Sequence, residues 1–116
     1  MIDTGYFAMI KTYPETDILI VVSRYYPRWA PPGLLFKPEF APSALLLSNW
    51  KAGTITWPEY EARYRAEMDD PVIQRRIMAY AKRIESEQVH RFLCHEKDGA
   101  PCHRVILKAI IEEASS

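Results

Sequence analysis

The sequence predicts an α/β fold: a small, Rossmann-like sheet of three to four mostly parallel strands, flanked by helices. The first observation is the unbroken apolar run at residues 18–22, which is mostly β-branched and typical of a strand buried on both faces. The second is that strand-like runs alternate with longer segments of helical periodicity, as in parallel sheets with helical crossovers. A mixed sheet with one antiparallel edge strand is the alternative.

Length and composition narrow the class of protein. At 116 residues, the chain has the size of a single domain over residues 1–116. Fifteen basic residues balance fifteen acidic ones, so nucleic acid is not an expected partner. No apolar run approaches the roughly 18 residues of a membrane span, and no signal-peptide pattern is present. We therefore expect no membrane partner and a cytoplasmic protein whose two cysteines are thiols.

The first third of the chain contains two expected strands and a long loop. A first strand is expected over residues 2–7, followed by a short helix or turn over 8–13. Pro14-Glu15-Thr16-Asp17 is a turn signal before the apolar strand at 18–22. Residues 23–33 contain three prolines and a glycine, which exclude regular structure and indicate a stiff loop.

Two helices are expected in the middle of the chain. Ser43 begins the first, over residues 44–51, and a glycine follows its end. Thr56 and Glu59 have the spacing of a capping box, which indicates a second helix from Thr56 to about Met68.

The last third is expected to be helix, strand and helix. Asp70-Pro71 marks the start of a helix over residues 72–87. A strand over 89–93 and a closing helix over 101–114 follow. The core-facing residues expected on the closing helix are Val105, Ile106, Ala109 and Ile110.

Reactive side chains are concentrated in residues 94–104, which hold both cysteines and two of the three histidines. Cys94 stands where the last strand ends, and Cys102-His103-Arg104 stands in the first turn of the closing helix. The amide groups of a helix's first turn attract anions and lower thiol pKa values. The sequence therefore predicts that any chemical site lies here.

The predicted topology brings further residues to this segment. In an open parallel sheet, ligands bind beyond the carboxyl ends of the strands. Guanidinium groups hold phosphate or carboxylate groups there, and aromatic rings stack on bases or sugars. The expected partner is therefore a phosphorylated or nucleotide-derived small molecule. The expected ligand-binding residues are Tyr6, Phe7, Ser23, Arg24, Tyr25, Arg28, Trp29, Glu96, His103 and Arg104.

A cysteine-dependent hydrolase or transferase is the alternative. Cys102 or Cys94 would be the nucleophile, and His103 or His95 would act as the base. Because adjacent residues of a helix point about 100° apart, His95 across the loop is the better partner for Cys102. Phosphatase loops place an arginine six positions after the cysteine, where this chain has Ala100, so a phosphatase of that kind is disfavoured.

Two other functions stay open. Two cysteines and two histidines, Cys94, His95, Cys102 and His103, have the composition of a structural zinc site. They form adjacent pairs, however, whereas zinc ligands usually stand two to four residues apart, so we predict no metal and no cofactor. A protein-interaction module that uses the loop at residues 25–32 is the other alternative, and the sequence leaves self-association open.

The segment Leu93-Cys94-His95-Glu96-Lys97, followed by Pro101-Cys102-His103-Arg104, resembles the Leu-Cys-x-Glu-Lys … Cys-His-Arg signature of the domain-of-unknown-function 488 family. The resemblance implies a small α/β fold with the strand-end motifs grouped together, and no settled biochemical role. His95 departs from the pattern, since a small or aromatic residue is more usual there. Further blocks resemble the family in the same order: Gly5–Ala8, Val21–Arg24, Pro27–Trp29, Ala41–Ser43 and Glu59–Tyr64.

Overall fold

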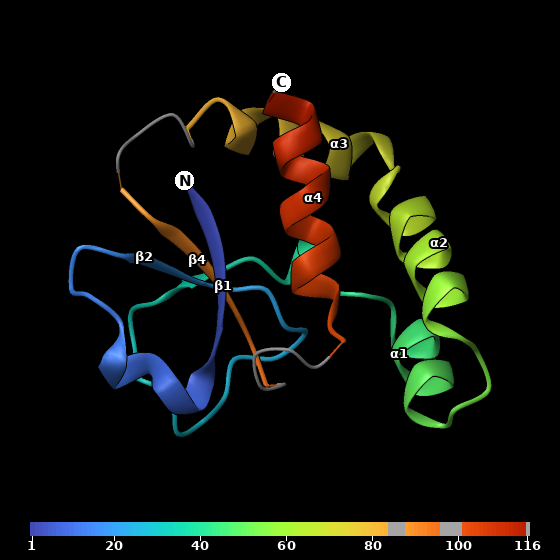
Figure 1. Cartoon of the computed structure of the whole chain (residues 1–116), viewed down its shortest axis with the longest axis horizontal. Coiled ribbons are helices and arrows are strands. Elements are labelled where there is room, and N and C mark those ends of the chain that lie inside the picture. Colours follow the sequence, from blue (N-terminus) through green and yellow to red (C-terminus); the bar gives the residue numbers. More distant parts are fainter. Residues whose placement is uncertain (84–87, 96–100, 116) are drawn as a thin grey trace.

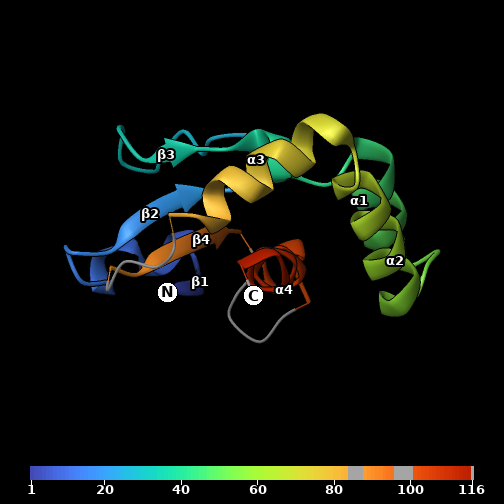
Figure 2. The same cartoon turned by 90° about the horizontal axis from the view of Figure 1, so that it is seen from above.

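Four parallel strands form the sheet in the order β1-β4-β2-β3 (Figures 1 and 2). The computed structural model describes residues 1–83, 88–95 and 101–115. Every strand pair in this part of the chain is parallel, so the predicted α/β class is confirmed and the mixed sheet is wrong. The strands are β1 (Ile2–Tyr6), β2 (Ile18–Val21), β3 (Leu35–Phe36) and β4 (His90–Cys94).

Strand β4 lies between β1 and β2, and this position determines which residues meet at the carboxyl edge. Its last residue, Cys94, is opposite Tyr6 of β1, and Leu93 is opposite Val21 of β2. The chain that leaves β2 stays beside β4, because the Val22 amide donates to the Leu93 carbonyl at 3.2 Å. The three strands therefore end side by side.

Helix α4 packs against β1 and β4 and against the helices α2 and α3, as Figure 1 shows. In the described part of the chain, none of the helices has the length and apolar character needed to span a membrane. The α-helices are α1 (Ala44–Lys51), α2 (Trp57–Met68), α3 (Pro71–Ala81) and α4 (His103–Ser115), and the 3-10 helices are η1 (Phe7–Thr12) and η2 (Pro38–Phe40).

The two faces of the sheet bury different residues, because successive side chains of a strand point to opposite sides. Ile20, Phe92 and Cys94 belong to the larger core, which the α-helices cover. Val21 and Leu93 belong to a smaller core, which η1 and the loop after β2 cover. Cys94 therefore points into the helical layer.

Side-chain caps determine where the helices begin. The predicted capping box is present, since Thr56 accepts from the Glu59 amide and Glu59 accepts from the Thr56 amide. Ser43 caps α1 through the amide of Leu46. Glu67 of α2 accepts from the Ser43 amide at 2.8 Å and from its hydroxyl at 2.5 Å. These bonds tie the start of α1 to α2.

Some boundaries differ from the prediction. Helix α3 ends at Ala81 rather than extending toward residue 87, and no glycine or proline between 82 and 88 marks this end. Residues 84–87 lie outside the described residues. Strand β3 was not predicted, because two residues carry no periodic signal.

Val105 was predicted to face the core but is 51% exposed. The predicted Ile106 is buried, and the predicted Ala109 and Ile110 are half-buried. The buried stripe of α4 continues through Leu107 and Ile111, which were not predicted. At about 100° per residue, that stripe turns Val105 toward solvent.

Candidate functional site

Cys94, Cys102 and His103 meet in the interior, where β4 ends and α4 begins. Cys94 is the last residue of β4, Cys102 directly precedes α4, and His103 is the first residue of α4. His103 Nδ1 lies 3.5 Å from Cys102 Sγ and 3.8 Å from Cys94 Sγ. All three residues are buried, so three reactive groups share one enclosed site, called here the thiol–imidazole cluster.

The contact between His103 and the backbone determines the orientation and tautomer of its ring. His103 Nε2 lies 2.8 Å from the carbonyl oxygen of Val22, just after β2. A carbonyl oxygen can only accept a hydrogen bond, so Nε2 carries a proton and donates it. The other ring nitrogen, Nδ1, faces Cys102 Sγ at 3.5 Å, whereas Cys94 Sγ lies about equally close to Nδ1, at 3.8 Å, and to Nε2, at 3.7 Å.

The surroundings favour the ionised form of Cys102. A hydrogen bond from Cys94 lowers the pKa of the Cys102 thiol well below its ordinary value, and burial acts in the opposite direction. His103, through its hydrogen bond and charge, and the backbone amide of Arg104 lower the same pKa further. In general, the pKa of a cysteine thiol is lowered at the start of a helix and next to a histidine side chain.

Tyr64 closes the cluster from the side of α2. Its ring centroid lies 5.6 Å from that of His103, and its hydroxyl donates to the Phe40 carbonyl at 2.7 Å. Burial raises the pKa of Tyr64 well above its ordinary value, so the hydroxyl stays neutral.

A pocket of about 250 Å³ opens beside the cluster, and we call it the strand-end pocket. Cys94 and His103 lie at its buried end, whereas Arg24 and Lys51 are exposed at its mouth. Cys102 does not line the pocket, and its Sγ contacts His103, which does. The lining residues are Ser23, Arg24, Tyr25, Pro42, Leu47, Lys51, Cys94, His95 and His103.

Two local contacts position the mouth of the pocket. The Ser23 hydroxyl donates to the Tyr25 carbonyl at 2.9 Å, which shapes the chain directly after β2. Lys51 of α1 also lines the pocket, and the start of α1 is held by the hydrogen bonds between Ser43 and Glu67. A second hollow of about 340 Å³ continues along α1 and shares Arg24, Tyr25, Leu47 and Lys51 with the strand-end pocket.

The predicted single crevice is divided in the structure. Six predicted residues line the strand-end pocket, whereas Phe7 and Trp29 line a separate hollow of about 290 Å³. The rings of Phe7 and Trp29 are 5.8 Å apart. The His95 ring contacts Phe7 at 4.8 Å and also lines the strand-end pocket, so it lies between the two hollows.

Other predicted residues do not line the strand-end pocket. Arg104 is only 1% exposed, because neighbouring residues of a helix point about 100° apart and His103 takes the direction of the pocket. Arg28 is exposed outside the pocket. Tyr6 is half-buried, and its amide donates to the Tyr13 hydroxyl at 3.0 Å. The predicted Glu96 lies outside the described residues.

The imidazole next to the thiols is that of His103, not His95. The prediction of His95 assumed that Cys102 and His103 diverge as neighbours in a helix do. Cys102 instead precedes the first helical residue, so its side chain can turn toward that of His103.

Sequence reasoning missed three lining residues, all on or next to α1. Lys51 lies more than forty positions from Cys94, and no periodic pattern connects them. The packing of α1 brings Leu47 and Lys51 to the strand ends: Trp50 contacts Trp57 and Tyr60 of α2, and Ser43 is bound by Glu67. The one sequence signal was the block containing Pro42, which belongs to the resemblance given above.

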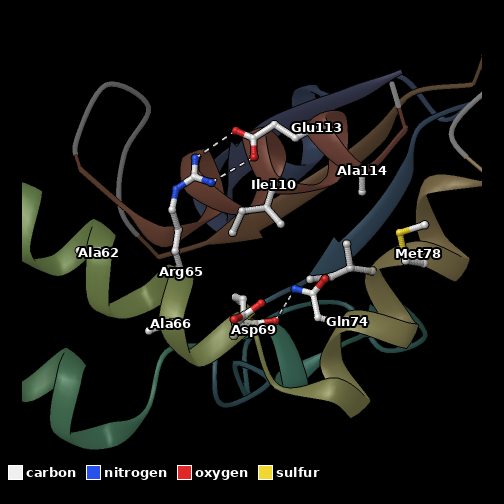
Figure 3. A pocket seen from close by; sticks show the side chains of 11 residues that line it. Ala62, Arg65, Ala66, Asp69, Gln74, Met78, Ile110, Glu113 and Ala114 are labelled. Atoms are coloured by element: carbon white, nitrogen blue, oxygen red, sulfur yellow. Dashed lines mark hydrogen bonds and ion pairs between the residues drawn. The ribbon is translucent and has the colours of Figure 1, made fainter.

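A larger hollow of about 650 Å³ lies between α2, α3 and α4, and we call it the helical groove (Figure 3). Arg65 of α2 and Glu113 of α4 form a two-pronged ion pair at its edge, with distances of 3.2 and 3.3 Å. None of the described residues that line it is a cysteine or a histidine. The helical groove is therefore large, but its described lining contains no thiol or imidazole group.

Comparison with known proteins identifies one relationship. The family model described as "DUF488-N3a: Active DUF488-N3 subclade" matches residues 8–115. This range includes the strand-end pocket and the thiol–imidazole cluster. No curated protein and no solved structure matches the chain.

Proposed function

The chain belongs to the domain-of-unknown-function 488 family, and from this premise we propose that its strand-end pocket binds a small phosphate-bearing or nucleotide-derived ligand. One observation carries the proposal. Arg24 and Lys51 stand together at the mouth of a pocket of about 250 Å³, at the carboxyl ends of β2 and β4. Ligands of open parallel sheets bind at this edge.

The charges around the pocket favour an anion. Arg24 and Lys51 are both cationic, and none of the described lining residues is acidic. Helix α4 begins at His103, so its positive end also faces this region. A guanidinium group and an ammonium group can together hold a phosphate through charge-assisted hydrogen bonds.

The volume favours a compact ligand. Pockets for drug-sized molecules span about 300–1,000 Å³, and the strand-end pocket, at about 250 Å³, is just below that range. A phosphate with a small organic group fits this space. A nucleotide-derived ligand would extend into the adjoining hollow along α1, where the Tyr25 ring is 74% exposed and offers a stacking surface.

Calorimetric titration with inorganic phosphate, ribose 5-phosphate and AMP tests the proposal. We expect at least one of them to bind, and Arg24→Gln and Lys51→Gln each to weaken binding about tenfold or more, as the loss of a charge-assisted hydrogen bond does. The matched control is Arg75→Gln, an exposed arginine of α3 that should leave binding unchanged. Failure of all three compounds to bind, or equal affinity in all variants, overturns the proposal.

A further variant, Arg28→Gln, tests whether the ligand occupies only the strand-end pocket or the wider crevice that the sequence predicts. Arg28 does not line the strand-end pocket, so its replacement should change phosphate affinity less than twofold. An effect as large as that of Arg24→Gln would mean that the ligand also occupies the hollow beside Trp29.

A cysteine-dependent hydrolase or transferase is the second candidate, and one contact favours it. Cys94 lines the strand-end pocket, and its Sγ lies within 3.8 Å of His103 Nδ1. In this step His103 takes the thiol proton, the Cys94 sulfur bonds to the phosphorus of a bound phosphate ester, and the P–O ester bond breaks. The alcohol leaves with the proton from His103, and water or a second alcohol then takes the phosphoryl group from the sulfur. Incubation of metal-free protein with the same phosphates, followed by mass spectrometry of the products, tests this. Product formed equally well by Cys94→Ser would overturn it.

A further inference from the structure

We infer that Cys94 Sγ, Cys102 Sγ and His103 Nδ1 form a binding site for one divalent zinc ion, whose remaining coordination position opens into the strand-end pocket. The inference goes beyond the proposed ligand binding and does not depend on it. It differs from the four-residue zinc site considered from the sequence, because the His95 ring packs against Phe7 instead of joining the cluster.

The spacing of the three ligand atoms matches zinc coordination. The ligand atoms of these residues all lie within 4.8 Å of one another. In a tetrahedral site with Zn–S of about 2.3 Å and Zn–N of about 2.0–2.1 Å, a sulfur and a nitrogen ligand are about 3.5–3.6 Å apart. The two sulfurs lie 3.5 and 3.8 Å from His103 Nδ1, close to this spacing, and the sulfur–sulfur separation is within 4.8 Å, so rotation of the two cysteine side chains can bring all three atoms around one ion.

The backbone prepares the histidine as a ligand. Metal-binding histidines usually donate their second ring N–H to a carbonyl or carboxylate, which orients the ring and selects the tautomer. His103 Nε2 makes this contact with the Val22 carbonyl at 2.8 Å. Cys94 Sγ is about equally close to both ring nitrogens, at 3.7 and 3.8 Å, and the Val22 contact leaves Nδ1 as the ligand atom.

The charge balance of the buried site also favours the ion. Cys94, Cys102 and His103 are 1%, 4% and 6% exposed, and two thiolates side by side in such surroundings are costly without a cation. One Zn²⁺ with two thiolates and a neutral imidazole has no net charge. Binding releases to solvent whatever protons the two sulfurs carry, so loading is favoured at higher pH.

The ligand types select the metal, and the pocket supplies the open position. Two thiolates and an imidazole suit zinc, whereas magnesium and calcium prefer oxygen ligands. Three protein ligands with one open position are typical of catalytic zinc, and structural zinc usually has four protein ligands. Cys94 and His103 line the strand-end pocket, so the fourth position is accessible to water or to an oxygen of a bound anion.

Metal analysis of the wild-type chain is the first test. Protein purified with a tag that binds no metal is stripped with a chelator, reloaded with ZnCl₂ and exchanged into metal-free buffer. We expect one zinc per chain by mass spectrometry of the elements. Co²⁺ in place of zinc should give the visible bands of a tetrahedral site and a near-ultraviolet sulfur-to-cobalt band. Protein that retains no zinc, or a cobalt spectrum without the sulfur band, overturns the inference.

Variants then identify the ligands. Cys94→Ser, Cys102→Ser and His103→Gln should each weaken zinc binding by more than the roughly 10- to 100-fold that changes to outer-shell groups cause. His95→Gln, in the residue adjacent to Cys94, should retain one zinc with wild-type affinity. Equal loss in His95→Gln would contradict the three-ligand site. Circular dichroism shows which variants fold. If none of the three ligand variants folds, the cobalt spectrum of the wild-type protein still tests whether the sulfurs bind the metal.

The same preparation separates this inference from the proposed function. Phosphate binding is titrated with stripped and with zinc-loaded protein. Zinc retained without phosphate binding overturns only the proposed ligand, and phosphate bound by a chain that retains no zinc overturns only the metal site.

Discussion

The strand-end pocket and the helical groove differ in the side chains that form their buried ends. The groove is the larger, at about 650 Å³ against about 250 Å³, yet its ion pair lies at the rim, where the Arg65 and Glu113 side chains are 36% and 63% exposed. The pocket is smaller, and its inner end consists of thiol and imidazole groups that contact one another. Polar groups gain most from their partners where water is excluded.

This comparison shows that the larger of the two hollows is not the one lined by reactive side chains. The pocket lies where β2 and β4 end and α4 begins, with α1 on a further wall, whereas the groove lies between the helices α2, α3 and α4. Four predictions test whether burial, more than the kind of contact, decides what each region contributes. All stability measurements are made with chelator present, so that bound metal adds nothing.

The largest effect is expected for Ile77→Ala in the floor of the groove. Ile77 is 1% exposed, and its truncation leaves a cavity that should lower the free energy of unfolding by about 2–5 kcal/mol. Urea unfolding measures the loss. Met78→Ala, at a neighbouring residue of α3 that is 47% exposed, is the control and should change stability by less than about 0.5 kcal/mol. Similar losses in both variants would mean that the floor is not part of the core.

Tyr64→Phe, beside the thiol–imidazole cluster, should have the next largest effect. It removes the hydroxyl that donates to the buried Phe40 carbonyl and should lower the free energy of unfolding by about 1–3 kcal/mol. Tyr25→Phe, on an exposed ring, is the matched control and should be close to neutral. A neutral Tyr64→Phe would show that the buried hydrogen bond contributes no more than an exposed hydroxyl.

A smaller effect depends on pH. Burial lowers the pKa of His90, and the positive N-terminus acts in the same direction. The unfolded chain, with a histidine pKa of about 6.5, therefore binds the proton more readily than the folded chain. The contribution of neutral His90 to the free energy of unfolding should be fully present above about pH 6.5. It should be lost as the pH falls from about 6.5 toward the lower pKa that His90 has in the folded chain.

Urea unfolding between pH 5 and 8 measures this dependence, with His90→Gln as the comparison. The other histidines are common to both proteins, so the difference between the two curves isolates His90. In the variant, the free energy of unfolding should fall less steeply with decreasing pH below about 6.5. The variant also loses the 2.7 Å contact between the Tyr80 hydroxyl and His90 Nδ1, which lowers its stability at every pH. Parallel curves would contradict the assignment.

The smallest effect is expected at the groove rim. Arg65→Gln removes the ion pairs with Glu61 and Glu113, which are solvent-exposed and should contribute about 0–1 kcal/mol. High salt should abolish the difference between variant and wild type. A loss as large as that of Tyr64→Phe would show that the rim pair is effectively buried.

Local signals were sufficient for much of the fold. The β-branched run at 18–22 identified β2, and the Thr56–Glu59 capping box identified the start of α2. Such features act within a few residues and can be recognised directly. The end of α3 and the two-residue strand β3 depend on packing, and they were missed.

The candidate site was predictable in composition but not in orientation. That Cys94, Cys102 and His103 belong together follows from a strand end and a helix start that are close in sequence. Which of His103 and Arg104 faces the thiols depends on the residue at which α4 begins. A shift of one residue turns a side chain by about 100°.

By itself the sequence determined the parallel α/β class, the family and the segment that carries the reactive groups, because hydrophobic periodicity and short motifs are local properties. Only the tertiary structure decided that the imidazole of His103 faces two sulfurs, that Arg104 is buried and that Lys51 reaches the pocket mouth. These depend on the phase of α4 and on how Glu67 holds α1, which are set by contacts between residues distant in the chain.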